Sequence, residues 1–291
     1  MSRGRAFEQA SERASQRAFF GVSALLFAAS AAVTIVWCTS MSAMDGMPMP
    51  GGWTMSMAWM RMCGQTWPGV AASFLRMWVV MMVAMMLPSL APMLWHYRQA
   101  VEVAGAAGDA AVASDAAVAS DASEMRRARL TALVAVGYYC VWTAFGMAAF
   151  TLGAALAALE LQLPALARAV PIAVGVVVLI AGALQFTAWK AHHLACCRAT
   201  PQRGRARPLA APAYTAWRHG LRLGLHCGCC CAGPTAALLV VGVMDLRAMA
   251  FVTAAISVER LAPAGERVAR AIGAVVIAAG LYLIVQAVGL A

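Results

Sequence analysis

Residues 169–191 read AVPIAVGVVVLIAGALQFTAWKA, an apolar run whose one charged residue, Lys190, stands near its end. A run of about 18 or more apolar residues can cross a bilayer as an α-helix. Further runs of this length lie near residues 18–37, 70–95, 130–158, 221–243 and 268–290. A shorter run, 247–261, predicts either a seventh helix or a re-entrant hairpin. We therefore expect an all-α fold, a polytopic transmembrane helical bundle with six or seven membrane spans.

Composition supports a membrane protein. Apolar residues make up 63% of the chain, charged residues 12%, and the mean hydropathy is +0.74. Soluble domains are about half apolar and about a quarter charged. No Ser-His-Asp arrangement, phosphate loop or nucleic-acid-binding signature is present, so we expect neither an enzyme nor a nucleic-acid partner.

The basic residues predict an orientation. If the N-terminus is cytoplasmic and all seven runs cross, the cytoplasmic segments hold every one of the 22 Lys and Arg except Arg61, Arg76, Arg168 and Arg247. This is a positive-inside pattern. The net charge of +10 then reflects topology and contact with anionic lipids. We expect a multi-pass protein of the bacterial inner (plasma) membrane, with the bilayer as its first partner.

The chain divides into a basic cytoplasmic arm, residues 1–17, and a single transmembrane helical domain, residues 18–291. Residues 38–68 form a Met-rich outer loop, and residues 198–218 form a basic cytoplasmic loop. Residues 99–129 are expected to be a low-complexity cytoplasmic linker because they contain the tandem hexapeptide Ala-Ala-Val-Ala-Ser-Asp at 110–121.

Two clusters of soft ligands flank the short loop between the fourth and fifth runs. Residues 224–234 read GLHCGCCCAGP, and residues 192–197 read HHLACC. Thiolate and imidazole suit Cu(I) and Zn(II). The spacing i, i+3, i+4 places Cys227, Cys230 and Cys231 on one helix face. The helices joined by the short loop should be antiparallel neighbours, and Gly220, Gly224 and Gly228 should let another helix approach closely.

We therefore expect a metal site near the cytoplasmic surface. Its main ligands would be His193, Cys197, Cys227, Cys230 and Cys231. Its secondary ligands would be His192, Cys196, His226 and Cys229. Thiol redox chemistry is the alternative, because a Cys-x-x-Cys spacing can also cycle through a disulfide.

The outer loop offers thioethers, which bind Cu(I) without losing a proton. Its candidate ligands are Met44, Met47, Met49, Met55 and Met57. The alternative is a flexible connector. Cys38 and Cys63 flank this loop and could be copper ligands or an outer disulfide. Met77, Met81 and Met85, spaced i, i+4 on the second run, could be exchange sites or ordinary packing.

Residues 70–290 resemble a bacterial family of uncharacterised function described as predicted metal-binding integral membrane proteins. The matching positions are Met81–Pro88, Gln185, Lys190, His193, Cys197, Arg198, Cys227, Cys230, Cys231, Gly242–Asp245 and Glu259. His193 stands where the commoner pattern has Cys, and Cys229 stands where Gly is usual. We expect Glu259 either to pair with the adjacent Arg260 or to act as a proton-coupled group.

These features predict an integral membrane protein that binds and handles a soft transition metal by transport or transfer. Copper as Cu(I) is favoured, and zinc is the alternative. A metal-donor or metal-acceptor protein would be its partner. The competing hypothesis is a membrane thiol-redox or metalloprotein-assembly partner without transport activity. The metal, the direction of movement and the oligomeric state stay open.

Overall fold

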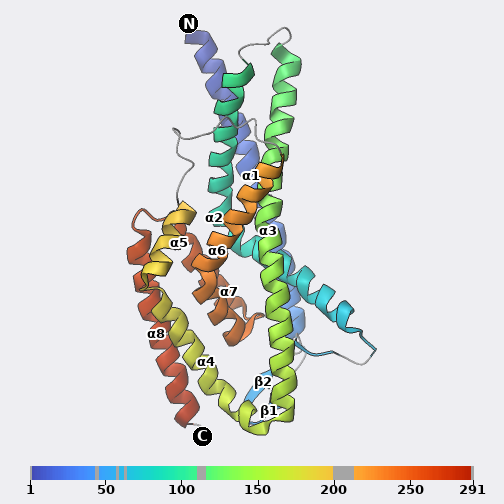
Figure 1. Cartoon of the computed structure of the whole chain (residues 1–291), viewed down its shortest axis with the longest axis vertical. Helices are drawn as coiled ribbons and strands as arrows, with labels where there is room; N and C mark the ends of the chain where they lie inside the picture. The colour runs from blue at the N-terminus through green and yellow to red at the C-terminus, as the bar shows by residue number, and fades with distance from the viewer. Residues whose placement is uncertain are drawn as a thin grey trace.

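The computed structural model describes residues 2–42, 46–56, 59–61, 64–109, 116–198 and 213–289. Over these ranges the chain forms a helical bundle with one small antiparallel hairpin (Figure 1). The elements are α1 Ser2–Ser42, β1 Met47–Met49, β2 Trp53–Met55, α2 Trp67–Asp109, α3 Ala116–Gln162, α4 Pro164–Leu184, α5 Ala188–Arg198, α6 Ala213–Gly242, α7 Leu246–Leu261 and α8 Gly265–Gly289.

The all-α bundle expected from the sequence is confirmed. Among the described residues, 6 helices are long and apolar enough to cross a membrane, namely α1, α2, α3, α4, α6 and α8. The short run 247–261 is one continuous helix, α7, rather than a hairpin. Its 16 residues reach only about 24 Å at the usual helical rise. It packs against α2, α6 and α8 within the bundle.

Glycines set the closest helix contacts. The Gly220–Gly224–Gly228 ridge of α6 does admit a neighbour, and that neighbour is α3. A Cβ on Gly220 would lie 2.3 Å from the Val134 carbonyl oxygen, and one on Gly224 would lie 2.9 Å from the Tyr138 carbonyl oxygen. Backbones this close leave no room for a side chain, which is how small residues bring membrane helices together.

The sequence suggested that the apolar run 169–191 forms one helix, but it does not. α4 ends at Leu184. Three successive turns follow, in which the backbone N–H groups of Gln185, Phe186 and Thr187 donate to the carbonyl oxygens of residues 182–184. The Thr187 hydroxyl accepts from the Lys190 amide at 3.3 Å and so caps the start of α5. The break allows the His/Cys cluster of α5 to lie against α6 and α7 instead of continuing α4.

The two predicted connecting segments, 99–129 and 198–218, lie only partly within the described residues. The linker 99–129 is largely helical, because α2 runs to Asp109 and α3 starts at Ala116. Arg127 joins these helix ends through ion pairs with Glu102 at 2.8 Å and Glu124 at 3.6 Å. The first hexapeptide copy, residues 110–115, lies outside the described residues, as does 199–212 of the basic loop.

Candidate metal centre

Four cysteine side chains from α5 and α6 meet in the protein interior. Cys227, Cys230, Cys231 and Cys197 are each at most 1% exposed. The sulfur atoms of Cys227 and Cys231 lie 3.9 Å apart, and the Cys230 thiol is close enough to Cys197 and Cys231 to interact with both. The i, i+3, i+4 spacing therefore places its three thiols on one buried face, and α5 contributes a fourth.

Pro234 shapes α6 beside these thiols. A proline has no N–H, so the carbonyl four residues earlier loses its helical donor. That carbonyl belongs to Cys230, and it accepts instead from the Lys190 ammonium at 2.8 Å. The lysine thus fixes the backbone of a thiol residue from a neighbouring helix.

Lys190 is itself held by a buried ion pair. Its Nζ lies 2.7 Å from Oε2 of Glu259, and the two side chains are 3% and 1% exposed. Gln185 donates to Oε1 of the same carboxylate at 2.8 Å. The expected local pair between Glu259 and Arg260 is therefore wrong: Glu259 pairs with α5, because adjacent helix residues point in different directions.

Arg260 points to the thiols instead. Its Nη1 donates to Ser89 Oγ at 2.9 Å and to Cys227 Sγ at 3.4 Å. Its Nη2 donates to the Met93 sulfur at 3.5 Å, and its buried Nε finds no partner among the described residues. The guanidinium is 6% exposed and forms no ion pair within the described ranges. A buried positive charge therefore lies beside the thiols without a carboxylate to balance it.

The imidazoles lie at the edge of this cluster. His193 Nδ1 is 3.3 Å from His226 Nδ1, and Cys196 Sγ is 3.7 Å from His192 Nε2. Burial, then repulsion from His226 and His192, lowers the pKa of His193, which favours the neutral ring that binds metals. His193 is thus oriented towards another imidazole rather than towards Cys197.

The Cys197 thiol has a different environment. A hydrogen bond with Cys230, together with burial, raises the pKa of Cys197, so this thiol must lose a proton before it can bind a metal. Cys229, the extra thiol of the motif, is half-buried and lies beside the buried face. Among the described residues no group of three or more His, Cys, Asp or Glu side chains is already arranged to hold a metal ion.

The outer loop has a core of its own. Met47 faces Met55 across the β1–β2 hairpin, and Met49 faces Trp53. Met49 is 8% and Met55 2% exposed, packed with Ala157 and Ala167 at the ends of α3 and α4. These two thioethers are therefore buried rather than exposed to solvent. Met44, Met57 and Cys63 lie outside the described residues.

Sulfur side chains also run through the core between the hairpin and the thiols. Met81, Met82, Met85 and Met86 of α2 are at most 2% exposed. The Cys38 sulfur, near the end of α1, lies 4.0 Å from that of Met244. These contacts are compatible with packing, for which Met is well suited.

Several residues around the thiols could not be assigned from the sequence. Arg260 and Tyr138 contact Cys227, with the Tyr138 hydroxyl 3.0 Å from its sulfur, and Ser89 and Met93 contact Arg260. One signal was available for Arg260: a charged residue within an apolar bundle needs a partner. That partner is distant in the chain, so no local pattern identifies it.

Comparison with known proteins gives one match. The family model named PpoB2 and described as a copper chaperone matches residues 75–283, well over half of the chain. This description names copper, which the resemblance seen in the sequence did not. No curated protein and no solved structure matches the chain.

Proposed function

This chain belongs to the PpoB2 copper chaperone family, and on that premise we propose that it binds Cu(I) in the membrane and exchanges it with a partner protein. Cys227, Cys230, Cys231 and Cys197 would hold the ion, with His193 at the edge. The protein would be a multi-pass protein of the inner membrane, with its N-terminus and thiol centre on the cytoplasmic side.

The unbalanced charge of Arg260 carries this proposal. A buried charge without a counter-charge is costly, and the atoms nearest to this guanidinium belong to a thiol, a hydroxyl and a thioether. Cu(I) bound by two thiolates has one net negative charge. Loading the centre with Cu(I) would therefore supply the anion that Arg260 lacks.

The sulfur geometry supports metal binding. With metal–thiolate bonds of about 2.3 Å, two sulfurs on one ion lie about 3.8 Å apart in a tetrahedral site and about 4.0 Å apart in a trigonal one. The Cys227 and Cys231 sulfurs are 3.9 Å apart. All four buried donors are thiols, which suit both Cu(I) and zinc. The Met93 thioether, which contacts Arg260 beside them, favours Cu(I).

The outer methionines extend the proposal to movement across the membrane. Met47, Met49 and Met55 would collect Cu(I) on the outer side, and the buried Met81 and Met85 would offer intermediate positions. Transport requires these sites to connect, whereas transfer on one side of the membrane requires the thiol centre alone.

Copper binding by purified protein tests the proposal. Under anaerobic reducing conditions, competition with a Cu(I) chelator should show one tightly held ion per chain. The combined variant Cys227→Ser, Cys230→Ser, Cys231→Ser should lose it. Cys140→Ser is the matched control, because Cys140 is exposed on α3 and is expected to leave binding unchanged. Full stoichiometry in the triple variant would show that the thiol centre is not the copper site.

The same measurements address the competing functions. If the protein holds zinc as tightly as Cu(I), or more tightly, copper is no longer the favoured metal. A protein that binds neither metal, but whose count of reactive thiols changes reversibly with oxidant, would be a thiol-redox partner.

A further inference from the structure

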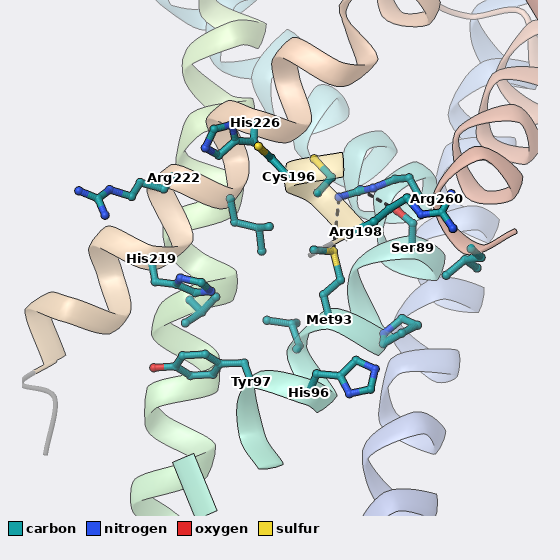
Figure 2. Close-up of a pocket in the computed structure, with 16 residues that line it drawn as sticks. Ser89, Met93, His96, Tyr97, Cys196, Arg198, His219, Arg222, His226 and Arg260 are labelled. Carbon is teal, nitrogen blue, oxygen red and sulfur yellow. Dashed lines mark hydrogen bonds between the residues drawn. The ribbon is translucent and has the colours of Figure 1, made fainter. Parts of the chain in front are cut away.

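A cavity adjoins the thiol centre. Its volume is about 360 Å³, and residues of α2, α3, α5, α6 and α7 line it. Cys196, Cys197 and Arg260 form part of its wall. Figure 2 shows the side chains that line the cavity. Because Cys197 lines it and Arg260 also contacts Cys227, the cavity reaches the thiol centre.

The cavity is too large for a bare metal ion. A water molecule takes about 30 Å³ of liquid volume, and pockets for small molecules range from about 300 to 1,000 Å³. Its lining includes exposed His96 and Arg222, so it opens at the protein surface. A small molecule can therefore enter it and reach Cys196 and Cys197.

The charge of the lining favours an anion. The charged side chains are Arg198, Arg222 and Arg260, and none of the described lining residues is acidic. Figure 2 shows Arg222 turned away from the centre of the space. Arg198 donates to the carbonyl oxygens of Glu259, Ala262 and Pro263, so it adds positive charge from a distance. Arg260 is the cation that reaches the cavity wall with a free donor, its Nε.

A second polar group in the lining also lacks a partner. The Tyr97 side chain is 7% exposed, its ring stacks on His219 at 5.3 Å, and its hydroxyl finds no hydrogen bond within the described ranges. Two polar side chains, each more than nine-tenths buried and each with an unused polar atom, border one cavity. Such groups cost free energy unless something binds them.

We propose that this cavity receives Cu(I) as an anionic complex with a low-molecular-weight thiol that carries carboxylates. The inference rests on the proposed function, and it names the form in which the copper arrives or leaves. Arg260 and the other basic residues attract the complex, and the half-buried Cys196 thiol meets it first. Methionine and cysteine side chains in the same wall are soft ligands for the ion during exchange.

The exchange needs no oxidant or reductant. The Cys196 sulfur forms a bond to Cu(I), the bond from Cu(I) to one small thiolate breaks, and the proton of Cys196 passes to the departing thiolate. Copper stays Cu(I) throughout, and the step is reversible. His192 Nε2, 3.7 Å from the Cys196 sulfur, is placed to relay that proton.

Loading kinetics test the cavity separately from the thiol centre. Purified apoprotein is mixed with the Cu(I) complex of glutathione, whose carboxylates add negative charge, or with that of 2-mercaptoethanol, which has no carboxylate. Each rate is divided by the rate at which the same complex loses Cu(I) to a soluble chelator. The proposal predicts at least about a fivefold advantage for the glutathione complex. S-methylglutathione, which keeps the carboxylates but has no thiol, should occupy the cavity and slow loading from the glutathione complex.

A variant pair supplies a structural check. Leu223→Trp would fill the cavity, since Leu223 lines it and is 9% exposed. Leu225→Trp, two residues along the same helix and 51% exposed, is its control. The filled variant should lose the glutathione advantage and the control should keep it.

Each outcome is decisive. Equal corrected rates from both complexes, or no effect of S-methylglutathione on the unmodified protein, would overturn the cavity proposal while leaving stoichiometric copper binding in place. Absence of copper binding at equilibrium from either complex would overturn the proposed function, and the cavity proposal with it.

Discussion

Removing the Glu259 carboxylate should destabilise the protein strongly. The Glu259→Gln variant leaves the Lys190 ammonium, 3% exposed, without an anion. Breaking a buried ion pair by removing one partner costs about 3–5 kcal/mol, because the remaining charge stays buried. Each single variant, Glu259→Gln, Glu259→Leu or Lys190→Met, should lose stability of that size, and the last two complete a double-mutant cycle.

The double variant Lys190→Met, Glu259→Leu should recover most of this loss. Replacing both charges with apolar side chains of similar size is often neutral or stabilising. One cost remains, because the Cys230 carbonyl that Pro234 deprives of its helical donor then also loses Lys190. An unsatisfied buried carbonyl costs about 1–3 kcal/mol. The coupling free energy between the two positions should therefore be at least about 3 kcal/mol.

Equilibrium unfolding in mixed detergent micelles, followed by tryptophan fluorescence, measures these differences. Glu102→Gln is the matched control, because its pair with Arg127 is 2.8 Å long, against 2.7 Å for the buried pair, but Glu102 is 51% exposed. That substitution should cost at most about 1 kcal/mol. A loss for Glu259→Gln no larger than that of the control would refute the buried pair as a determinant of stability.

Two other predictions test topology and packing. A membrane-impermeant maleimide should label the half-buried Cys196 in inverted vesicles and not in intact cells, and labelling in intact cells would reverse the orientation. Gly220→Ala should cost about 1–3 kcal/mol by overpacking α6 against α3, since its Cβ would lie 2.3 Å from the Val134 carbonyl oxygen. Gly21→Ala, where nothing lies within 4 Å of the new Cβ, should cost nothing, and equal effects at the two glycines would contradict this packing.

The fold was predictable wherever the signal is local. Apolar runs long enough to cross a bilayer identified each of the six long helices, because hydrocarbon solvent demands such runs of any spanning helix. The run 169–191 was wrongly expected to form one helix, since its break at Gln185–Thr187 depends on turn and capping hydrogen bonds rather than on hydrophobicity. The hairpin at 47–55 was also missed, because its thioethers become buried only against α3 and α4.

The candidate site also has a part that the sequence predicted and a part that it could not predict. Helical spacing by itself placed Cys227, Cys230 and Cys231 on one face, and the glycine ridge predicted a close neighbour. The sequence could not show that His193 faces His226, that Lys190 pairs with Glu259, or that Arg260 lies beside Cys227.

The sequence by itself therefore determined the helices and the thiol face of α6, since both follow from periodicity along a single helix. Tertiary structure alone decided which charge balances which, and which side chains surround the thiols. The partners of Arg260 show why: Ser89 and Cys227 are 171 and 33 residues away in the chain. Burial of charges is settled by contacts between helices, and no pattern along one helix encodes them.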